Sequence, residues 1–487
     1  MAQNVLQFIN GEYTKGGSGA TFENISPVDG SLISVVHEAK KDEVDRAVSA
    51  AKAALQGPWA SMTMAERNSI LHKIADGINA RFDEFLKAEC ADTGKPYSIA
   101  SHIDIPRGAA NFKVFADLVK NVPDETFHLE TPDGAGALNY GRRSPKGVIA
   151  VISPWNLPLL LMTWKVGPAL ACGNTVVVKP SEETPTTTAL LGQVMNDAGL
   201  PKGVFNVVQG FGPDSAGAYL TEHPDVNAIT FTGETRTGEI IMKAAAVGLR
   251  NISMECGGKN SAIVFDDADV NKAVAGTMRS AFVNCGQVCL GTERVYVHKN
   301  IFDEFADKLA KGARDLVVGP PNGENVNMGP LISHEHRDKV LSYYNKAVEQ
   351  GSEVLLGGGV PDMPSKYAKG AWIEPTIWLR SKDDSAVVRE EIFGPCCSLL
   401  PFEDEDEVLA RANDTKYGLA GSIWTENTSR AHRTAQKLDA GLVWVNSWFL
   451  RDLRTAFGGA KHSGIGREGG VHGLEFYTEL KNICIKL

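Results

Sequence analysis

The chain lacks any apolar run long enough to span a bilayer. Its most apolar stretches, 148–151 and 157–162, are interrupted by Pro154, Asn156 and Pro158 and fall well short of the roughly 20 apolar residues that a span needs. The first residues, 1–8, contain no positive charge followed by an apolar core, so we expect no secretory signal. The sequence therefore predicts a cytoplasmic protein with no membrane partner.

Basic clusters and paired cysteines are also missing. The formal net charge is −10 and no block of lysine and arginine occurs, which argues against a nucleic-acid partner. The eight cysteines show no paired disulfide spacing, so we expect reduced thiols. Cys285 and Cys289 have no histidine pair or second CxxC motif nearby, so we expect no metal site.

The pattern that is present is an alternation of short apolar strands and helices. At 487 residues the chain should form roughly two or three domains. A helix-rich N-terminal third, with helical spacing at 42–54 and 65–90, precedes the alternation. The expected strands are 148–152, 175–179, 205–208 and 228–232, with helices at 186–198 and 214–222 among them. This order predicts an α/β fold with a parallel sheet covered on both faces, and a similar alternation after Asn260 predicts a second α/β domain.

Two segments stand outside this alternation. Residues 126–140 have the pattern of a hairpin around Thr131-Pro132-Asp133-Gly134. The tail, 476–483, is strand-like. We expect the tail to pair with the hairpin or with another subunit.

Three side chains suggest covalent catalysis through a thiol. Cys289 lies on a glycine-flanked loop, 286–291, between an expected helix at 270–281 and a strand at 293–297. Glu255 follows an apolar segment and precedes a flexible pair of glycines, and Asn156 lies between two prolines. A nucleophile, a carboxylate base and an amide donor are what an acyl-forming reaction needs.

Each of these residues has a plainer interpretation, which for Glu255 is that of a solvated surface carboxylate. Most cysteines are small buried apolar residues, as we expect for Cys90, Cys172 and Cys484, and Cys285 is a second choice of nucleophile. Asn156 could simply begin a turn before Pro158.

Two stretches suggest a dinucleotide. Gly233 and Gly238 lie between the strand 228–232 and an expected helix at 239–246, where a glycine turn and a helix N-terminus favour a phosphate. The spacing is not G-x-G-x-x-G, so an ordinary tight turn remains an alternative, and the turn at Gly210-Phe211-Gly212 adds modest support.

The stretch from Lys179 to Glu182 follows the second strand, where a ribose would lie. An acid there accepts hydrogen bonds from ribose hydroxyls and repels a 2′-phosphate, which favours NAD over NADP. The alternative is a charged helix start with Ser181 as its cap.

These stretches together resemble the aldehyde dehydrogenase superfamily, and the resemblance covers essentially the whole chain. The matching stretches, in the family's order and spacing, are Pro154-Trp155-Asn156, Lys179-Pro180-Ser181-Glu182, Phe231-Thr232-Gly233, Glu255-x-Gly257-Gly258-Lys259, Gly286-Gln287-Val288-Cys289 and Glu390-Glu391-Ile392-Phe393-Gly394-Pro395. The resemblance implies a Rossmann-like NAD-binding domain (1–125 and 146–256), a catalytic domain (257–460) and a small β oligomerisation arm (126–145 and 473–487). It also implies a homodimer or homotetramer.

The resemblance assigns a role to each matching residue. Cys289 matches the nucleophile, Glu255 the general base and Asn156 the oxyanion-binding amide. Lys179 and Glu182 match contacts of the adenosine ribose, Glu391 matches a contact of the nicotinamide ribose, and Phe393 lies against the nicotinamide end. The remaining expected cofactor residues are Ile152, Ser153, Trp155, Ser181, Gly212, Phe231, Thr232, Gly233, Glu234, Thr237 and Gly238. The family often has serine at Glu234 and leucine at Cys256, so a serine contact to the pyrophosphate is in doubt.

Within the superfamily the chain is most similar to dehydrogenases of 2-hydroxymuconic semialdehyde, with those of 2-aminomuconic semialdehyde very near. Segments 101–112 and 444–454 carry this likeness and contain Arg107 and Arg451, with Arg454 as a spare. We expect these arginines to hold a substrate carboxylate in a fork geometry, although ordinary ion pairs are an alternative.

The expected reaction is NAD-dependent oxidation of this acidic semialdehyde, a product of aromatic ring meta-cleavage, to a dicarboxylate through a thioester. The alternatives are the 2-amino substrate, a broader aldehyde range, a CoA-acylating enzyme, or a structural protein of the same fold.

Overall fold

A computed structural model describes residues 3–487 of the chain. Its first sheet has eight strands in the order β22-β12-β11-β8-β9-β10-β2-β3. The five central strands are parallel: β8 (Val148–Ile152), β9 (Thr175–Lys179), β10 (Phe205–Val207), β11 (Ala228–Thr232) and β12 (Asn251–Glu255). The first four are the strands that the sequence predicts.

This sheet is wound in both directions from β8. β8 pairs with β9 on one side and with β11 on the other, so the chain order reverses between β8 and β11. Ligands of such sheets bind at the carboxyl ends of the strands, beside this reversal. Ile149 and Val151 of β8 face one core, whereas Val148, Ala150 and Ile152 face the other, as the alternation of side chains along a strand requires.

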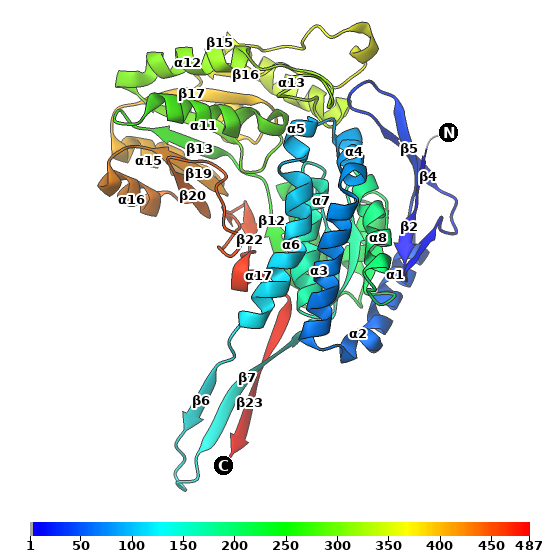
Figure 1. Ribbon diagram of the computed structural model, residues 1–487. Coiled ribbons are helices and arrows are strands. Elements are labelled where there is room, and N and C mark those ends of the chain that lie inside the picture. Colours follow the sequence, from blue (N-terminus) through cyan, green and yellow to red (C-terminus); the bar gives the residue numbers. More distant parts are fainter. Residues whose placement is uncertain (1–2) are drawn as a thin grey trace.

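Helices cover both faces of this first sheet (Figure 1). They are α1 (Lys41–Ala54), α2 (Pro58–Ser61), α3 (Met64–Ala80), α4 (Phe82–Thr93), α5 (Tyr97–Ala100), α6 (Asp104–Leu118), α7 (Pro158–Ala171), α8 (Thr186–Asp197), α9 (Ala216–Glu222) and α10 (Thr235–Ala246). The helical spacing at 65–90 belongs to two helices, because the backbone leaves the helical region at Arg81, with φ −108° and ψ 26°. Every residue of α7 is buried, so this helix lies at the centre of the domain.

The N-terminal third also contains strands that the sequence analysis did not predict. They are β1 (Gln3–Val5), β2 (Gln7–Ile9), β3 (Glu12–Thr14), β4 (Thr21–Ile25) and β5 (Leu32–His37). β2 and β3 extend the first sheet, and the other three form a small sheet of their own. Most are only three to five residues long, too short for alternation to be recognised.

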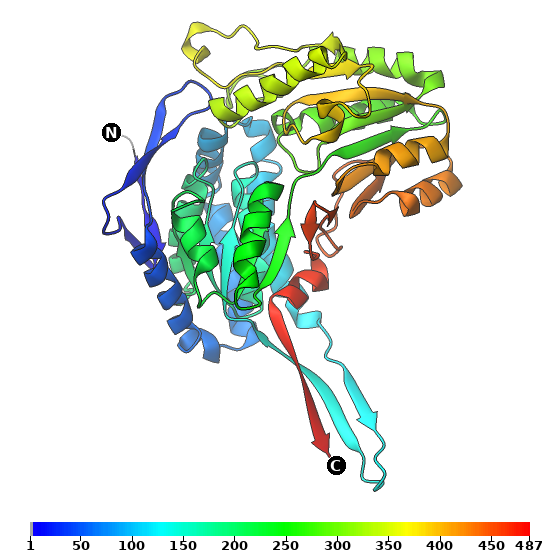
Figure 2. The same cartoon turned by 180° about the vertical axis from the view of Figure 1, so that it is seen from behind.

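A second α/β sheet follows, as predicted, in the order β15-β16-β17-β14-β13-β19-β20. Its strands are β13 (Asn260–Val264), β14 (Thr292–His298), β15 (Glu353–Leu356), β16 (Thr376–Leu379), β17 (Cys396–Phe402), β19 (Ala420–Trp424) and β20 (Leu442–Val445). The helices are α11 (Val270–Phe282), α12 (Phe302–Arg314), α13 (His334–Glu349), α14 (Ala386–Arg389), α15 (Glu405–Asn413) and α16 (Thr428–Lys437). Figure 2 shows this layer above the first sheet from behind.

Three antiparallel strands form an arm that projects from the body (Figures 1 and 2). β6 (Thr126–Leu129) and β7 (Ala137–Pro145) form the expected hairpin, and β23 (Thr478–Lys486) pairs along β7 from Thr478 to Lys486. Of the two partners expected for the tail, the hairpin or another subunit, the structure shows the hairpin. Cys484 is exposed on β23, so its expected burial is wrong. Across residues 3–487, no helix is both long and apolar enough to cross a membrane.

Three further elements return the chain from the second sheet to the first: β21 (Ala460–Lys461), β22 (Gly464–Ile465) and α17 (Gly470–Phe476). β18 (Tyr417–Gly418), which precedes β19, pairs with β21. β22 pairs with the end of β12, where Glu255 lies opposite Gly464. Only 256–259 separate β12 from β13, so the carboxyl end of the first sheet faces the start of the second.

Candidate active site

Cys289 lies on a sharply turned loop just before β14. Asn284, Cys285 and Gly286 all have left-handed backbones, with φ of 54°, 55° and 69°. A Cβ at Gly286 would lie 2.0 Å from the Gly394 carbonyl oxygen, so only glycine fits there. The Cys289 carbonyl accepts a 2.7 Å hydrogen bond from the Asn260 side chain, which fixes the loop. Cys289 is partly exposed, whereas Cys285 is buried in the core of the second sheet.

Glu255 lies beside this thiol at the end of β12. The side chain is buried, and neither carboxylate oxygen has a hydrogen-bond partner within the described part of the chain. Burial, with the charge of Glu468 adding to it, raises the pKa of Glu255 to about 7. Burial and the carboxylates of Glu255 and Glu391 hold the pKa of the Cys289 thiol well above its usual value. Glu255 is therefore placed to take the proton of a thiol that is protonated at rest.

Asn156 is buried at the end of the loop after β8. Its Nδ2 donates to the Gln287 carbonyl at 3.0 Å, two residues before Cys289. An amide nitrogen carries two hydrogens, so a second donor remains for a ligand. The Asn156 carbonyl is held from the other side by Lys95 Nζ at 2.9 Å and by Asn284 Nδ2 at 3.1 Å. The structure thus brings the thiol, the acid and the amide together.

Lys95 itself belongs to a buried cluster that the sequence analysis missed. Its ammonium lies 2.8 Å from Asp104 Oδ2 and 4.0 Å from Glu89 Oε1. Two carboxyl groups thus share one buried cation, and burial raises the pKa of both, to about 8 for Glu89. The cluster forms a rigid support under the Asn156 turn.

A second missed cluster lies below Glu255. Glu468 accepts hydrogen bonds from Lys165 Nζ at 2.6 Å, Trp164 Nε1 at 2.8 Å and Ser253 Oγ at 3.2 Å. Ser253 and Glu255 share a face of β12, because alternate residues of a strand point the same way. Glu468 therefore sets the electrostatic environment of Glu255.

The expected cofactor residues gather at the carboxyl ends of β8, β9 and β11. Ile152 and Thr232 end the two strands that flank the reversal, and Ser153 N donates to the Lys179 carbonyl at 3.2 Å. Lys179 Nζ pairs with Glu182 Oε2 at 3.0 Å. Ser181 does not cap a helix, because α8 begins only at Thr186; its hydroxyl accepts from Glu183 N within the loop. The charged-helix-start interpretation is therefore wrong.

The glycine turn differs from expectation in one respect. α10 begins at Thr235, not at residue 239, so Thr237 and Gly238 lie in its first turns and Glu234 occupies the N-cap position without a side-chain cap. A Cβ at Gly233 would lie 2.6 Å from the buried Phe231 ring, so a larger residue would clash at this position. Gly212, in contrast, has nothing within 4 Å of a built Cβ, so open space lies beside it.

Glu391 and Phe393 occupy a turn against the segment after Glu255. Glu391 Oε1 accepts from Gly258 N at 2.8 Å, and a Cβ at Gly257 would lie 2.0 Å from Glu391 Oε2. Burial and the charge of Glu293 raise the pKa of Glu391 to about 7. The two glycines thus allow the carboxylate to approach the backbone.

Phe393 forms an aromatic group with Trp155 and His336. Its ring meets the Trp155 ring edge-on, with 5.3 Å between centroids. Burial lowers the pKa of His336 to about 4, so the ring is neutral, and Nε2 donates to the Phe393 carbonyl at 2.8 Å. Trp155 precedes Asn156, so this group links Asn156 to the Glu391 turn.

Arg107 and Arg451 are two cations that form no ion pair with a carboxylate in residues 3–487. Arg451 is stacked on Trp164 and Phe457, with its guanidinium carbon 4.2 and 3.8 Å from the ring centroids. Arg107 Nε and Arg451 Nε and Nη2 are buried without hydrogen-bond partners in residues 3–487, and no ion pair of either arginine occurs there. Burial and the positive charge of Arg107 lower the pKa of Arg451 to about 9. The ordinary ion-pair alternative therefore fails for these two arginines.

Arg454 behaves differently. It is exposed and forms a close ion pair with Asp452 at 2.6 Å. It is therefore not one of the arginines with buried, unpaired nitrogens.

A doubly wound sheet with a thiol, a buried carboxylate and a side-chain amide gathered beside its carboxyl edge is the architecture of an aldehyde oxidoreductase. The chain belongs to the aldehyde dehydrogenase family, whose sequence model matches residues 13–483. It is thus an enzyme that oxidises aldehydes.

Known relatives match over the whole length. The chain is 69% identical over 485 residues to a 2-hydroxymuconic semialdehyde dehydrogenase of Pseudomonas sp. (strain CF600), covering 100% of both chains. It is 56% identical to a 2-aminomuconic 6-semialdehyde dehydrogenase of Pseudomonas sp., covering 99% of this chain and 97% of that one. An aldehyde dehydrogenase from Bacillus cereus, solved as an NAD⁺ complex, superposes with a TM-score of 0.96 at 39% identity, covering 100% of this chain and 97% of that chain.

Proposed function

We propose that the chain oxidises 2-hydroxymuconate 6-semialdehyde to the dicarboxylate, with NAD as the acceptor. The observation that carries this proposal is the presence of two partly buried arginines, Arg107 and Arg451, whose buried nitrogens have no hydrogen-bond partner in residues 3–487. A planar guanidinium binds a carboxylate through two parallel hydrogen bonds, and a muconic semialdehyde carries a carboxylate at the end away from its aldehyde. The identity of 69% to a relative named for this substrate supports the choice over the 2-amino substrate.

The residues of the crevice fit a dinucleotide. Gly212 has open space beside it at the carboxyl edge of the sheet, and Lys179 with Glu182 offers a cation and an acid for the adenosine ribose. Glu391 would hold the nicotinamide ribose, with Phe393 beside the ring. The acid at Glu182 favours NAD over a 2′-phosphorylated dinucleotide. When bound, NAD supplies a hydride acceptor.

The chain's own groups perform the remaining chemistry. Glu255 takes the thiol proton as Cys289 sulfur bonds to the aldehyde carbon. The Asn156 amide, with the Cys289 backbone N–H, stabilises the oxyanion, and losing one such donor typically costs about 3–4 kcal/mol of barrier. Once the hydride has left, a thioester remains on Cys289. After Glu255 has released that first proton to solvent, it takes a proton from water as the water oxygen bonds to the acyl carbon. The carbon–sulfur bond then breaks, and the Cys289 thiolate leaves and regains a proton from Glu255. The presence of this base favours hydrolysis over transfer to CoA.

The assembly and the location follow the same proposal. We assign 1–125 with 146–256 to cofactor binding, 257–460 to catalysis, and 126–145 with 473–487 to an oligomerisation arm of a homodimer or homotetramer in the cytoplasm. The arm carries exposed apolar side chains that a second subunit would cover: Phe127, Leu129, Leu480, Ile485 and Leu487.

A substrate comparison tests the proposal. NADH formation is followed with 2-hydroxymuconate 6-semialdehyde, its 2-amino analogue and a neutral unsaturated aldehyde of the same length. We expect the highest kcat/KM for the 2-hydroxy acid and a much lower value for the neutral aldehyde. Equal kcat/KM for the acidic and neutral aldehydes would overturn the assigned substrate class.

A further inference from the structure

Glu293, the second residue of β14, is a buried carboxylate to which neither the sequence patterns nor the resemblance gives a role. Its Oε1 accepts from Phe393 N at 2.9 Å, and both of its oxygens lie 3.1 Å from Ile392 N. It also forms a close ion pair with Lys259, whose side chain is fully buried. A single carboxylate thus binds two backbone donors of the Glu391–Phe393 turn and one cation.

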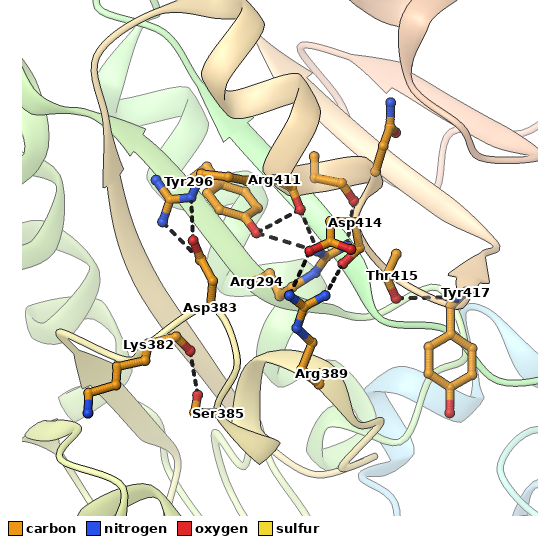
Figure 3. Close-up of polar contacts among 12 residues, drawn as sticks. Arg294, Tyr296, Lys382, Asp383, Ser385, Arg389, Arg411, Asp414, Thr415 and Tyr417 are labelled. Atoms are coloured by element: carbon orange, nitrogen blue, oxygen red, sulfur yellow. Dashed lines mark hydrogen bonds and ion pairs between the residues drawn. The ribbon is translucent and has the colours of Figure 1, made fainter.

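The cation is itself held in place. Arg294, which points to the other side of β14, donates from Nε to the Lys259 carbonyl at 2.9 Å. Arg294 also donates to the carbonyls of Ala412, at 2.9 Å, and Arg411, at 3.2 Å. Figure 3 shows Arg294 beside Arg411 and Asp414, in a network that extends to Arg389. Two consecutive residues of β14 therefore hold Lys259: Glu293 binds its ammonium and Arg294 binds its carbonyl. The ion-pair partner of Glu293 is thus fixed in position.

The turn held by Glu293 is strained, and two of its backbone N–H groups depend on this carboxylate. Phe393 has φ +62°, a left-handed backbone that is uncommon for an aromatic residue. Its N–H and that of Ile392 have Glu293 as their acceptor. The preceding side chain, Glu391, reaches Gly258 N on the opposite loop. Moving the Glu293 carboxylate would leave two backbone donors unpaired and release the turn that aims Glu391.

We propose that Glu293, clamped by Lys259, is a positioning residue that sets where Glu391 and Phe393 meet the nicotinamide end of the cofactor. This rests on the proposed function, because it takes Glu391 as a cofactor contact. Glu293 touches neither the thiol nor the substrate arginines in this arrangement. Its effect should therefore fall on cofactor binding and leave the thiol chemistry intact.

Two measurements separate these effects. The first is the dissociation constant of NAD, obtained by calorimetric titration of the full-length enzyme. The second is hydrolysis of 4-nitrophenyl acetate without NAD, in which Cys289 displaces 4-nitrophenolate from the acetyl group and Glu255 then assists water in releasing acetate. This ester reaction uses the thiol, the base and the oxyanion donor but no dinucleotide.

In Glu293→Gln, an NH₂ group replaces one carboxylate oxygen, and the negative charge beside Lys259 is lost. We expect the NAD dissociation constant to rise about tenfold or more, the size expected when hydrogen bonds to a charged group are lost. Ester hydrolysis should stay within about twofold, since the catalytic groups keep their contacts. The matched control is Glu43→Gln, another buried glutamate that accepts two backbone N–H groups, from Gly17 at 2.8 Å and Lys40 at 3.0 Å. It should change neither quantity.

Glu391→Gln distinguishes failure of the inference from failure of the proposed function. If Glu391→Gln weakens NAD binding and Glu293→Gln does not, the positioning role is wrong and the cofactor assignment stands. If Glu391→Gln leaves NAD binding unchanged, both are wrong. Equal losses of NAD binding and ester hydrolysis in Glu293→Gln would also overturn the positioning role. Should that variant fail to fold, Glu293→Asp, which shortens the reach but keeps the charge, must show the same split.

Discussion

The Lys95 ammonium donates a 2.9 Å hydrogen bond to the backbone carbonyl of Asn156, although the two residues are 61 positions apart. This contact fixes the turn whose side chain is assigned to the oxyanion. The cation is fully buried and is balanced by Asp104 and Glu89, so it cannot turn to solvent.

Replacing Lys95 should therefore weaken oxyanion binding without affecting the cofactor. In Lys95→Met we expect kcat for aldehyde oxidation and the rate of ester hydrolysis to fall together by about tenfold or more, somewhat less than when an oxyanion donor is lost outright. The NAD dissociation constant should not change. Lys113→Met is the control, because Lys113 belongs to the same domain and forms an exposed pair with Asp76 at 2.7 Å. Normal ester hydrolysis in folded Lys95→Met would refute the positioning role.

Glu255→Gln should separate the two halves of the reaction. In this variant the Cys289 thiol loses its base, but it also loses the neighbouring negative charge that raises its pKa. Its proton can then pass to water, so acylation should persist. Water loses its base, so steady turnover should fall by roughly 10²–10⁴-fold. Stopped-flow absorbance should show about one NADH per active site in a burst, followed by a stalled phase. Unchanged multiple turnover would contradict the assigned role.

The pH dependence of hydrolysis should reflect the raised pKa of Glu255. A base works only when deprotonated, so thioester hydrolysis should increase as pH rises through about 7 and then level off. Glu468 raises the pKa of Glu255, so Glu468→Gln should shift this rise to lower pH. Glu475→Gln, an exposed acid of the same C-terminal segment, is the control. A profile that does not move in Glu468→Gln would show that Glu468 does not tune the base.

The arginine pair should act on acidic substrates alone. Arg451→Ala should lower kcat/KM for 2-hydroxymuconate 6-semialdehyde by about 100-fold, as expected for lost hydrogen bonds between charged groups. The loss for a neutral aldehyde should be much smaller. Arg454→Ala is the matched control, because Arg454 is exposed and already paired with Asp452. Equal losses of kcat/KM with both aldehydes would show that Arg451 does not bind the substrate carboxylate.

The sequence sufficed to predict the central strands because each is a short, continuous apolar run bounded by turn residues. The strands β1 to β5 were not predicted, because they are short and polar residues interrupt their apolar runs. The start of α10 was placed too late, because its first turn contains Thr235, Arg236 and Thr237, which have no apolar periodicity.

The supporting residues of the site could not be predicted for a different reason. Glu293 and Phe393 are 100 positions apart, and Lys165 and Glu468 are 303 apart. Contacts between residues so far apart produce no recognisable pattern in the local sequence. Cys289, Glu255 and Asn156, in contrast, each lie in a recognisable motif. A lone charged residue within an apolar stretch, such as Lys165 in α7, was the only available signal of a buried partner.

The most direct test of the whole account is the mass of the peptide that contains Cys289. The Glu255→Gln enzyme is mixed with NAD and 2-hydroxymuconate 6-semialdehyde, quenched in acid, digested and analysed by mass spectrometry. We expect the acyl group on Cys289, none on Cys285, and no oxidation by Cys289→Ser. Absence of the acyl group from that peptide, together with normal oxidation by Cys289→Ser, would contradict the mechanism.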